Sequence, residues 1–209
     1  MFEQIARAFQ EGGPFMYAIT AALGFGLAVI AERAYVLLFR FNVDGRKFYT
    51  ELRKLVQSGQ LQAARALCGN APLPRILGVG IDAAAAGDER AVQNAVDEEA
   101  LAVIPQVEKR IHYLAMIANV STLLGLLGTI VGLMQAFQAV AGADPSQKAA
   151  LLARGISMAM NTTAYGLVVA IPCMAVYSFL QSKATKIIDE VDEYSVKLIN
   201  LLLASRRGV

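Results

Sequence analysis

Three long apolar stretches constrain the fold of this chain more than any other feature of its sequence. They cover residues 15–39, 113–141 and 155–180, and the second and third contain no charged residue. Each exceeds the roughly 20 apolar residues that a helix needs to cross a bilayer. Apolar residues make up 56% of the 209 residues and charged residues only 17%, which is unusual for a soluble domain. The sequence therefore predicts an all-α integral membrane protein with three transmembrane helices.

The distribution of basic residues predicts the orientation of these helices. Ten Lys and Arg lie in the 40–110 region and five in the 181–209 tail, whereas the 142–154 turn holds two. Because cytoplasmic loops are enriched in Lys and Arg, we expect the region and the tail in the cytoplasm, and the N-terminus and the turn on the periplasmic side. Apolar residues at helical spacing in the N-terminal arm predict an interfacial helix at 1–12.

The region between the first two spans is rich in helix signals. Helical stretches are expected at 46–57 and 61–67, with breaks at 69–72 and at Leu73-Pro74. This segment is therefore a folded helical region rather than a linker.

Two of the spans are predicted to continue as helices beyond the bilayer. A segment without glycine runs from Asp88 into the second span, and one helix from there to Ala141 would be roughly 80 Å long. Pro105 is a place where that helix can kink. Apolar residues of the tail keep a helical period: Ile187, Ile188, Val191, Tyr194, Leu198, Leu201 and Leu202. We expect these long extensions to pack as a cytoplasmic helical bundle.

The second span carries a face of small and hydroxyl-bearing residues. Thr122, Gly125, Thr129 and Gly132 follow one another at spacings of three and four, which places them on one side of a helix. Gly128 and Gly132 also form a GxxxG pattern. Two interpretations remain open at this point. The face serves close helix packing, with threonines bonding their own backbone, or it lines a polar path.

The third span repeats this chemistry. Ala159, Thr163, Gly166 and Ala170 form a second stripe, with the polar residues Asn161 and Thr162 beside it. An asparagine without a partner in hydrocarbon costs several kcal/mol, so Asn161 must face protein or water. The candidate polar path consists of Thr122, Thr129, Asn161, Thr162 and Thr163. The candidate packing residues are Gly125, Gly128, Gly132, Gly166 and Pro172.

Other kinds of site find little support. The one histidine, His112, is isolated, and Cys68 and Cys173 have no partner at metal-ligand spacing. The chain has no nucleophile motif and no Gly-rich phosphate loop, so we nominate no catalytic residue, metal ligand or cofactor. Glu32 and Arg33, near the end of the first span, form an interfacial charge pair for which packing is favoured over chemistry.

The spans resemble those of a known family. LLGLLGTIVGLMQAF and GISMAMNTTAYGLVVAIP are similar to the signature second and third spans of the MotA/TolQ/ExbB proton-channel family, and AERAYVLL resembles its ER-containing segment. With three spans rather than four, the chain resembles the TolQ/ExbB branch, and NTTAYG favours the gliding-motor AglR type. The resemblance implies a multi-pass protein of the bacterial inner membrane.

The resemblance also implies an assembly and a mechanism. The family's homopentamer encloses a dimer of a single-span ExbD/TolR/MotB-like partner and converts proton motive force into rotation, as a motor stator does. The family's pore threonines correspond to Thr129 and Thr163. Many relatives have a glutamate where this chain has Met158, which implies that the essential acid is an aspartate of the partner. Protons are favoured over sodium as the transported ion.

Two function classes remain open on the sequence. The first is an ion-driven stator subunit with a threonine-lined path, and the second is a non-conducting structural scaffold in the membrane. The driven load also stays open between TonB-like transport, Tol-like envelope maintenance and gliding motility.

Overall fold

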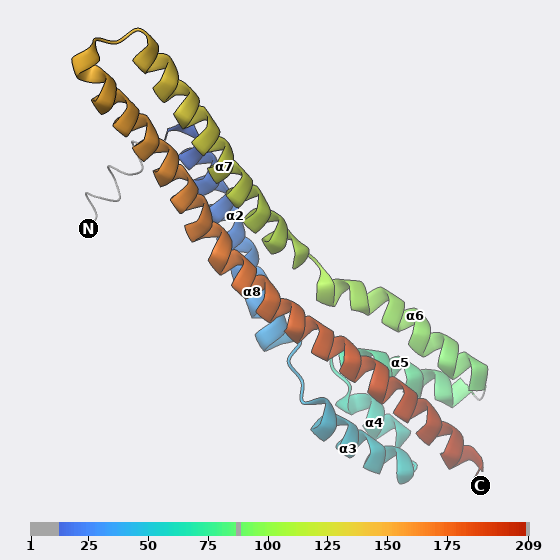
Figure 1. Ribbon diagram of the computed structural model, residues 1–209. Helices are drawn as coiled ribbons and strands as arrows, with labels where there is room; N and C mark the ends of the chain where they lie inside the picture. The colour runs from blue at the N-terminus through green and yellow to red at the C-terminus, as the bar shows by residue number, and fades with distance from the viewer. Residues whose placement is uncertain (1–12, 87–88, 208–209) are drawn as a thin grey trace. The chain divides into compact units, whose positions relative to one another are not determined.

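The computed structural model describes residues 13–86 and 89–207, and within them every regular element is a helix. The elements are α2 (Pro14–Tyr35), the π-helix η1 (Val36–Arg40), α3 (Gly45–Gln57), α4 (Leu61–Leu67), α5 (Pro72–Ala86), α6 (Glu89–Glu108), α7 (His112–Ala141) and α8 (Pro145–Arg207) (Figure 1). Three helical stretches are long and apolar enough to cross a membrane, which confirms the all-α class with three candidate spans. The interfacial helix predicted at 1–12 lies outside the described residues.

The chain divides into two compact units. The first, which we call the span unit, consists of residues 13–31 and Arg110–Ser178. The second, which we call the helical bundle, consists of Glu32–Lys109 and residues 179–207. Helices α2 and α8 each contribute residues to both units.

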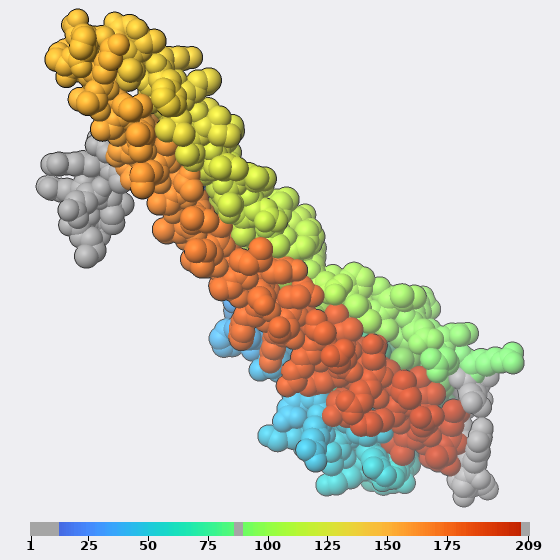
Figure 2. All heavy atoms as spheres, in the orientation of Figure 1, coloured from blue at the N-terminus to red at the C-terminus, as the bar shows by residue number. Residues whose placement is uncertain are grey.

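The span unit combines α7, the first part of α8 and most of α2. Figure 1 shows α7 and α8 running side by side as a hairpin, and Figure 2 shows their atoms in contact along it. Large apolar side chains such as Leu126 and Ile130 of α7 and Val168 of α8 point outward and are more than half exposed. A helix that is apolar on every side is typical of a membrane segment.

The connection between α7 and α8 is shorter than the predicted 142–154 turn. Helix α7 ends at Ala141 and α8 begins at Pro145. The carbonyl of Asp144 accepts hydrogen bonds from the backbone N–H of Gln147 and Lys148, at 2.9 and 3.2 Å. Proline is favoured at the first position of a helix because its missing N–H has no intrahelical partner there. Residues 145–154 are therefore the first turns of α8.

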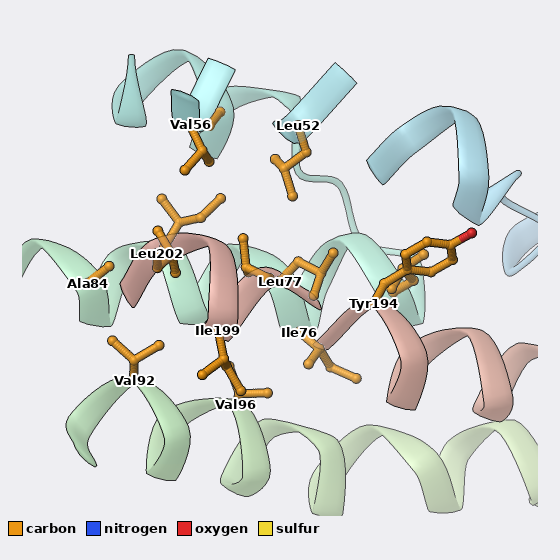
Figure 3. Close-up of a cluster of buried hydrophobic side chains, with 14 of the residues drawn as sticks. Leu52, Val56, Ile76, Leu77, Ala84, Val92, Val96, Tyr194, Ile199 and Leu202 are labelled. Atoms are coloured by element: carbon orange, nitrogen blue, oxygen red, sulfur yellow. The ribbon is translucent and has the colours of Figure 1, made fainter. Parts of the chain in front are cut away.

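The helical bundle has a continuous apolar core built from five helices (Figure 3). Its members are Leu52, Val56, Ala64, Leu73, Ile76, Leu77, Ile81, Ala84, Val92, Val96, Val103, Val191, Tyr194, Leu198, Ile199 and Leu202. Four residues of the predicted period in the tail, Val191, Tyr194, Leu198 and Leu202, belong to this core. The extensions of the chain beyond the spans thus pack as a helical bundle.

One predicted break inside the bundle is wrong. Leu73-Pro74 does not end a helix but lies in the first turn of α5. The first hydrogen bond of that helix runs from the N–H of Arg75 to the carbonyl of Ala71. Pro72 and Pro74 therefore occupy positions whose N–H groups would have no intrahelical partner, and they cost the helix nothing.

The helical extension of the second span is present, but it is interrupted after the expected kink at Pro105. Pro105 lies inside α6, and the break comes after it, between Glu108 and His112. Arg110 adopts a left-handed backbone conformation with φ of 62°. A left-handed residue just after the last turn is a common way to end a helix, although glycine is the usual residue there.

Candidate functional site

The central feature of the span unit is a pair of threonine hydroxyls, which we call the hydroxyl pair. The Oγ1 atoms of Thr129 on α7 and Thr163 on α8 are hydrogen-bonded to each other. Both also lie within hydrogen-bond distance of the carbonyl oxygen of Gly125, at 3.1 Å from Thr129 and 2.9 Å from Thr163. Both side chains are half-buried.

The hydrogen bonds of the hydroxyl pair cannot all form at once. Each hydroxyl has one proton to donate, so two protons serve the three contacts among Thr129, Thr163 and the Gly125 carbonyl. At any moment one hydroxyl donates to the other, and the second donates to the carbonyl. The two arrangements differ in the direction of the hydrogen bond between the hydroxyls and in which hydroxyl donates to the carbonyl. The pair is therefore a polar group that can reverse its donor direction without moving a heavy atom.

Glycine at position 125 brings these hydroxyls together. A Cβ atom at Gly125 would lie 3.2 Å from the Cα of Thr163 and 3.3 Å from the carbonyl oxygen of Thr162. One turn further along α8, a Cβ at Gly166 would lie 2.6 Å from the carbonyl oxygen of Ser121. The two backbones are thus in direct contact, as small residues permit in membrane helices.

The same packing continues toward the α7–α8 connection. Thr162 is fully buried, and a Cβ at Gly128 would lie 2.3 Å from its Cγ2 methyl group. The hydroxyl of Thr162 donates to the carbonyl of Met158 at 2.9 Å. Thr162 therefore fills the space over Gly128 with its methyl group and lies outside the hydroxyl pair.

Two further glycines extend this contact. Gly132 packs against Ala159, and a Cβ at Gly155 would lie 2.2 Å from the Cβ of Ala136. The sequence identified Gly132 but not the pairing of Gly155 with Ala136. Taken together, the structure places Gly125, Gly128, Gly132 and Gly166 in the α7–α8 contact.

Three other candidate residues are not brought into this group. Thr122 is exposed, and its hydroxyl donates to the carbonyl of Ala118 in its own helix at 3.0 Å. Asn161 is half-buried on α8. Pro172 is exposed, and α8 continues through it. Met158 is half-buried, and its sulfur lies 3.7 Å from the position of a Cβ on Gly13.

The charge pair of Glu32 and Arg33 lies in the helical bundle. Arg33 is only 5% exposed, and its Nη2 lies 2.7 Å from Oε1 of Glu32. Its Nη1 donates to the backbone carbonyl of Gln106 at 3.5 Å. That carbonyl belongs to the last turn of α6, whose carbonyls have no intrahelical partners and attract cations. Arg33 thus stabilises the end of a neighbouring helix.

Sequence reasoning missed two polar residues of the span unit. Tyr165 lies within the NTTAYG motif, and its hydroxyl is 3.0 Å from Oγ1 of Thr20 on α2. Because Thr20 already donates to the carbonyl of Met16, Tyr165 is the donor in this contact. Ser121 is fully buried where Gly166 touches its backbone. A tyrosine and a serine inside apolar spans were the signals that could have revealed both residues.

The comparisons with known proteins agree with this architecture. The profile of the MotA/TolQ/ExbB proton channel family matches residues 69–193, which is more than half of the chain and includes both threonines of the hydroxyl pair. The chain is 35% identical to the Tol-Pal system protein TolQ of Haemophilus influenzae over 116 residues, which cover 54% of this chain and 49% of the relative. It is 37% identical to the biopolymer transport protein exbB1 of Vibrio cholerae over 98 residues, covering 47% and 42%.

A third relative is matched over more of its length. An ExbB-like biopolymer transport protein of Synechocystis sp. is 35% identical over 158 residues, which cover 71% of this chain and 73% of the relative. By contrast, the matches span about half the length of the TolQ and exbB1 relatives. The profile match and this coverage lead to one conclusion: the chain belongs to the MotA/TolQ/ExbB proton channel family.

Proposed function

We propose that this chain is the channel subunit of a complex in the bacterial inner membrane that uses proton motive force to drive work in the cell envelope. The observation that carries the proposal is the hydroxyl pair of Thr129 and Thr163, held against the Gly125 carbonyl by backbone-to-backbone packing. Family membership supports the same function.

The hydroxyl pair suits a path for protons. Hydroxyls can donate and accept hydrogen bonds, and here the direction of donation can reverse. The segments 113–143 and 155–182 contain no acidic or basic side chain. The pair can therefore pass or orient hydrogen bonds, but neither span can hold a proton on a carboxylate. Proton transfer through a membrane protein usually needs a titratable group at that depth.

The missing acid points to a partner protein. We propose a homopentamer that encloses a dimer of a single-span ExbD/TolR/MotB-like protein, whose membrane aspartate takes the proton. Met158, where many relatives have a glutamate, supports the assignment of the acid to the partner. The outward-facing residues Leu126, Ile130 and Val168 offer apolar surface for neighbouring subunits and lipid. Proton transfer onto and off the aspartate would rotate the pentamer around the dimer.

The orientation and the ion are part of this proposal. The excess of Lys and Arg in the 40–110 region and the 181–209 tail favours a periplasmic N-terminus and a cytoplasmic C-terminus. Protons are favoured over sodium because the lining spans carry no extra acidic residue. The names of the relatives, Tol-Pal system protein and biopolymer transport protein, favour envelope maintenance or transport as the load over gliding.

The function is tested by isolating the complex from its native membrane. A tagged form of this chain is purified, and co-purifying proteins are identified by mass spectrometry. We expect a short single-span protein with an aspartate at its membrane entry. The complex is then reconstituted into vesicles that contain a pH-sensitive dye, and a pH gradient with a membrane potential is imposed. We expect proton uptake by vesicles that contain the complex. We expect none with this chain alone, or with a complex in which the membrane aspartate of the partner is replaced by asparagine.

A structural scaffold is the second candidate function. The glycine contacts of α7 with α8 favour it, because they explain the small residues by packing alone. An intact complex that takes up no protons under the imposed gradient would support the scaffold and contradict the channel. Absence of any single-span partner would contradict the proposed mechanism as well.

A further inference from the structure

A cavity of about 370 Å³ lies in the helical bundle, and three arginines from three elements line it. Arg40 is the last residue of η1, Arg65 lies on α4 and Arg75 lies on α5. Among the lining residues that the structure describes, Glu99 of α6 is the one acidic residue. The cavity is far in sequence from the hydroxyl pair, and nothing in the proposed proton path uses it.

Two of the arginines are held in place by carboxylates through one side of the guanidinium group. Nε of Arg65 donates to Oδ2 of Asp82 at 2.7 Å, and Nε of Arg75 lies 2.6 Å from Oε1 of Glu99. Guanidinium carries five N–H donors. The terminal nitrogens of both side chains therefore remain able to bind a further acceptor.

Gly78 of α5 makes room for Arg65. A Cβ atom at this position would lie 3.0 Å from Nη1 of Arg65 and 3.1 Å from the Cβ of Cys68. The guanidinium group thus lies directly against the backbone of α5. The close contact with Gly78 and the ion pair with Asp82 together hold the guanidinium group in this position.

Arg40 supplies the charge that no carboxylate balances. It is exposed, and it forms no ion pair with any residue in the described ranges 13–86 and 89–207. Arg40 ends the π-turn η1, which is closed by the hydrogen bond from the N–H of Phe41 to the carbonyl of Val36, at 2.8 Å. Such wide turns are rare and occur frequently at functional sites. Three arginines face two carboxylates here, so a net positive charge remains.

The other polar groups of the lining add no negative charge. Asn70 offers an amide, and burial raises the pKa of the Cys68 thiol to about 11, so the thiol is neutral at physiological pH. A cavity lined by three guanidinium groups and one carboxylate, with otherwise neutral neighbours, matches an oxyanion. Guanidinium groups bind both carboxylate and phosphate oxygens in paired hydrogen bonds, and phosphate has enough oxygens to serve three of them.

We propose that this cavity binds a phosphate group, with Arg40, Arg65 and Arg75 as its ligands. The phosphate can belong to an anionic phospholipid or to a soluble phosphate compound. Arg40 directly follows the apolar first span, where lipid headgroups lie. The cavity is also large enough to hold a small soluble phosphate compound. The shared chemistry is one phosphate bound by three guanidinium groups.

The absence of tryptophan from the sequence allows a direct binding measurement. Phe41 lines the cavity, so Phe41→Trp places the only tryptophan of the chain beside the site. Its fluorescence is followed in detergent while inorganic phosphate replaces chloride at constant ionic strength. In a second arm, phosphatidylglycerol replaces phosphatidylcholine in mixed micelles. A response to the lipid alone assigns the site to a headgroup, and a response to both assigns it to phosphate from either source.

Two variants in the same background separate the cavity from general surface charge. Arg40→Gln removes the unbalanced ligand and is expected to weaken binding about tenfold or more, as the loss of a charge-assisted hydrogen bond does. Arg53→Gln removes the same charge from an exposed position of α3 that does not line this cavity, and binding should be unchanged. No response in either arm, or an equal loss in both variants, would overturn the proposal.

Discussion

The span unit and the helical bundle use large and small side chains in opposite ways. In the bundle, large apolar residues such as Leu77 and Leu198 are fully buried. In the span unit, Gly125 and Gly128 occupy the contact between helices, while Ile130 points outward and is 57% exposed. Burial of apolar surface from water drives the packing of the bundle. Lipid removes that driving force, so membrane helices associate through close packing and hydrogen bonds.

This difference has a consequence for function. The bundle core consists almost entirely of apolar side chains, which leave no room for polar groups. The backbone contact between α7 and α8 instead holds two hydroxyls and a carbonyl at one point, because no bulky side chain separates them. The close backbone packing that is typical of membrane helices can thus also hold polar atoms together inside an apolar hairpin.

The largest effect is expected from removing a core side chain of the bundle. Leu198→Ala should lower the free energy of unfolding by about 2–5 kcal/mol, because it deletes fully buried apolar atoms and leaves a cavity. Val196 lies on the same helix and is 59% exposed, so Val196→Ala is the control and should change the free energy of unfolding little. Unfolding in mixed micelles at fixed protein concentration measures both. Equal effects would mean that this core is not the source of the bundle's stability.

A second effect concerns the chemistry of the bundle interior. Burial raises the pKa of Cys68 from 9.0 to about 11. Below pH 9 the thiolate fraction should therefore be roughly a hundredfold smaller than in the unfolded chain, and alkylation should be slower in proportion. The rate should continue to rise with pH up to about 11. Peptide mapping by mass spectrometry follows this cysteine separately from Cys173. An alkylation rate that levels off near pH 9 would contradict the buried setting.

The span unit should respond to one added methyl group. Gly128→Ala places a Cβ 2.3 Å from the methyl group of Thr162, and overpacking of this kind costs about 1–3 kcal/mol. Gly24→Ala is the matched control, because a Cβ there meets nothing within 4 Å. Alanine also has the higher helix propensity, so the control should be neutral or slightly stabilising. The same micelle titration compares the two, and a tolerated Gly128→Ala would refute the close contact.

The smallest effect is expected at Arg110, where the chain passes from one unit to the other. Arg110→Gly and Arg110→Val both remove the arginine side chain, so their difference reports chiefly the strain of the left-handed backbone. The glycine variant should be more stable by roughly 1–2 kcal/mol, because a β-branched residue is strained at positive φ. Thermal unfolding in detergent provides the comparison. Equal stabilities would show that the backbone at this position relaxes freely.

Local patterns predicted much of this molecule. Long apolar stretches indicated the spans, and the helical period of residues such as Val191 and Leu198 indicated the part of α8 that packs in the bundle. Spacing of three and four placed Thr129 and Gly125 on one face. The same spacing included Thr122, which is exposed. A repeat along one helix defines a stripe, but it does not say where along that stripe the neighbouring helix makes contact.

Features that depend on distant residues could not be predicted. Nothing near Arg33 in the sequence indicates that it binds the carbonyl of Gln106. The left-handed residue after α6 is Arg110 and not a glycine, so the sequence does not indicate the helix end there. A proline such as Pro74 is compatible both with a helix break and with a helix start. The three arginines that line the cavity of the helical bundle come from three separate elements. The contact of Arg33 and the lining of the cavity arise from tertiary contacts, for which a local pattern has no signal.

The most direct test of this account changes the hydroxyl pair without changing its shape. In the complex purified with its single-span partner, Thr129→Val with Thr163→Val removes both hydroxyls and keeps the volume. Proton uptake by vesicles should be abolished while the complex still assembles. Thr129→Ser with Thr163→Ser keeps the hydroxyls and should retain uptake, as should Thr122→Val. Normal uptake by the double valine variant would contradict the central claim that these two hydroxyls form part of the proton path.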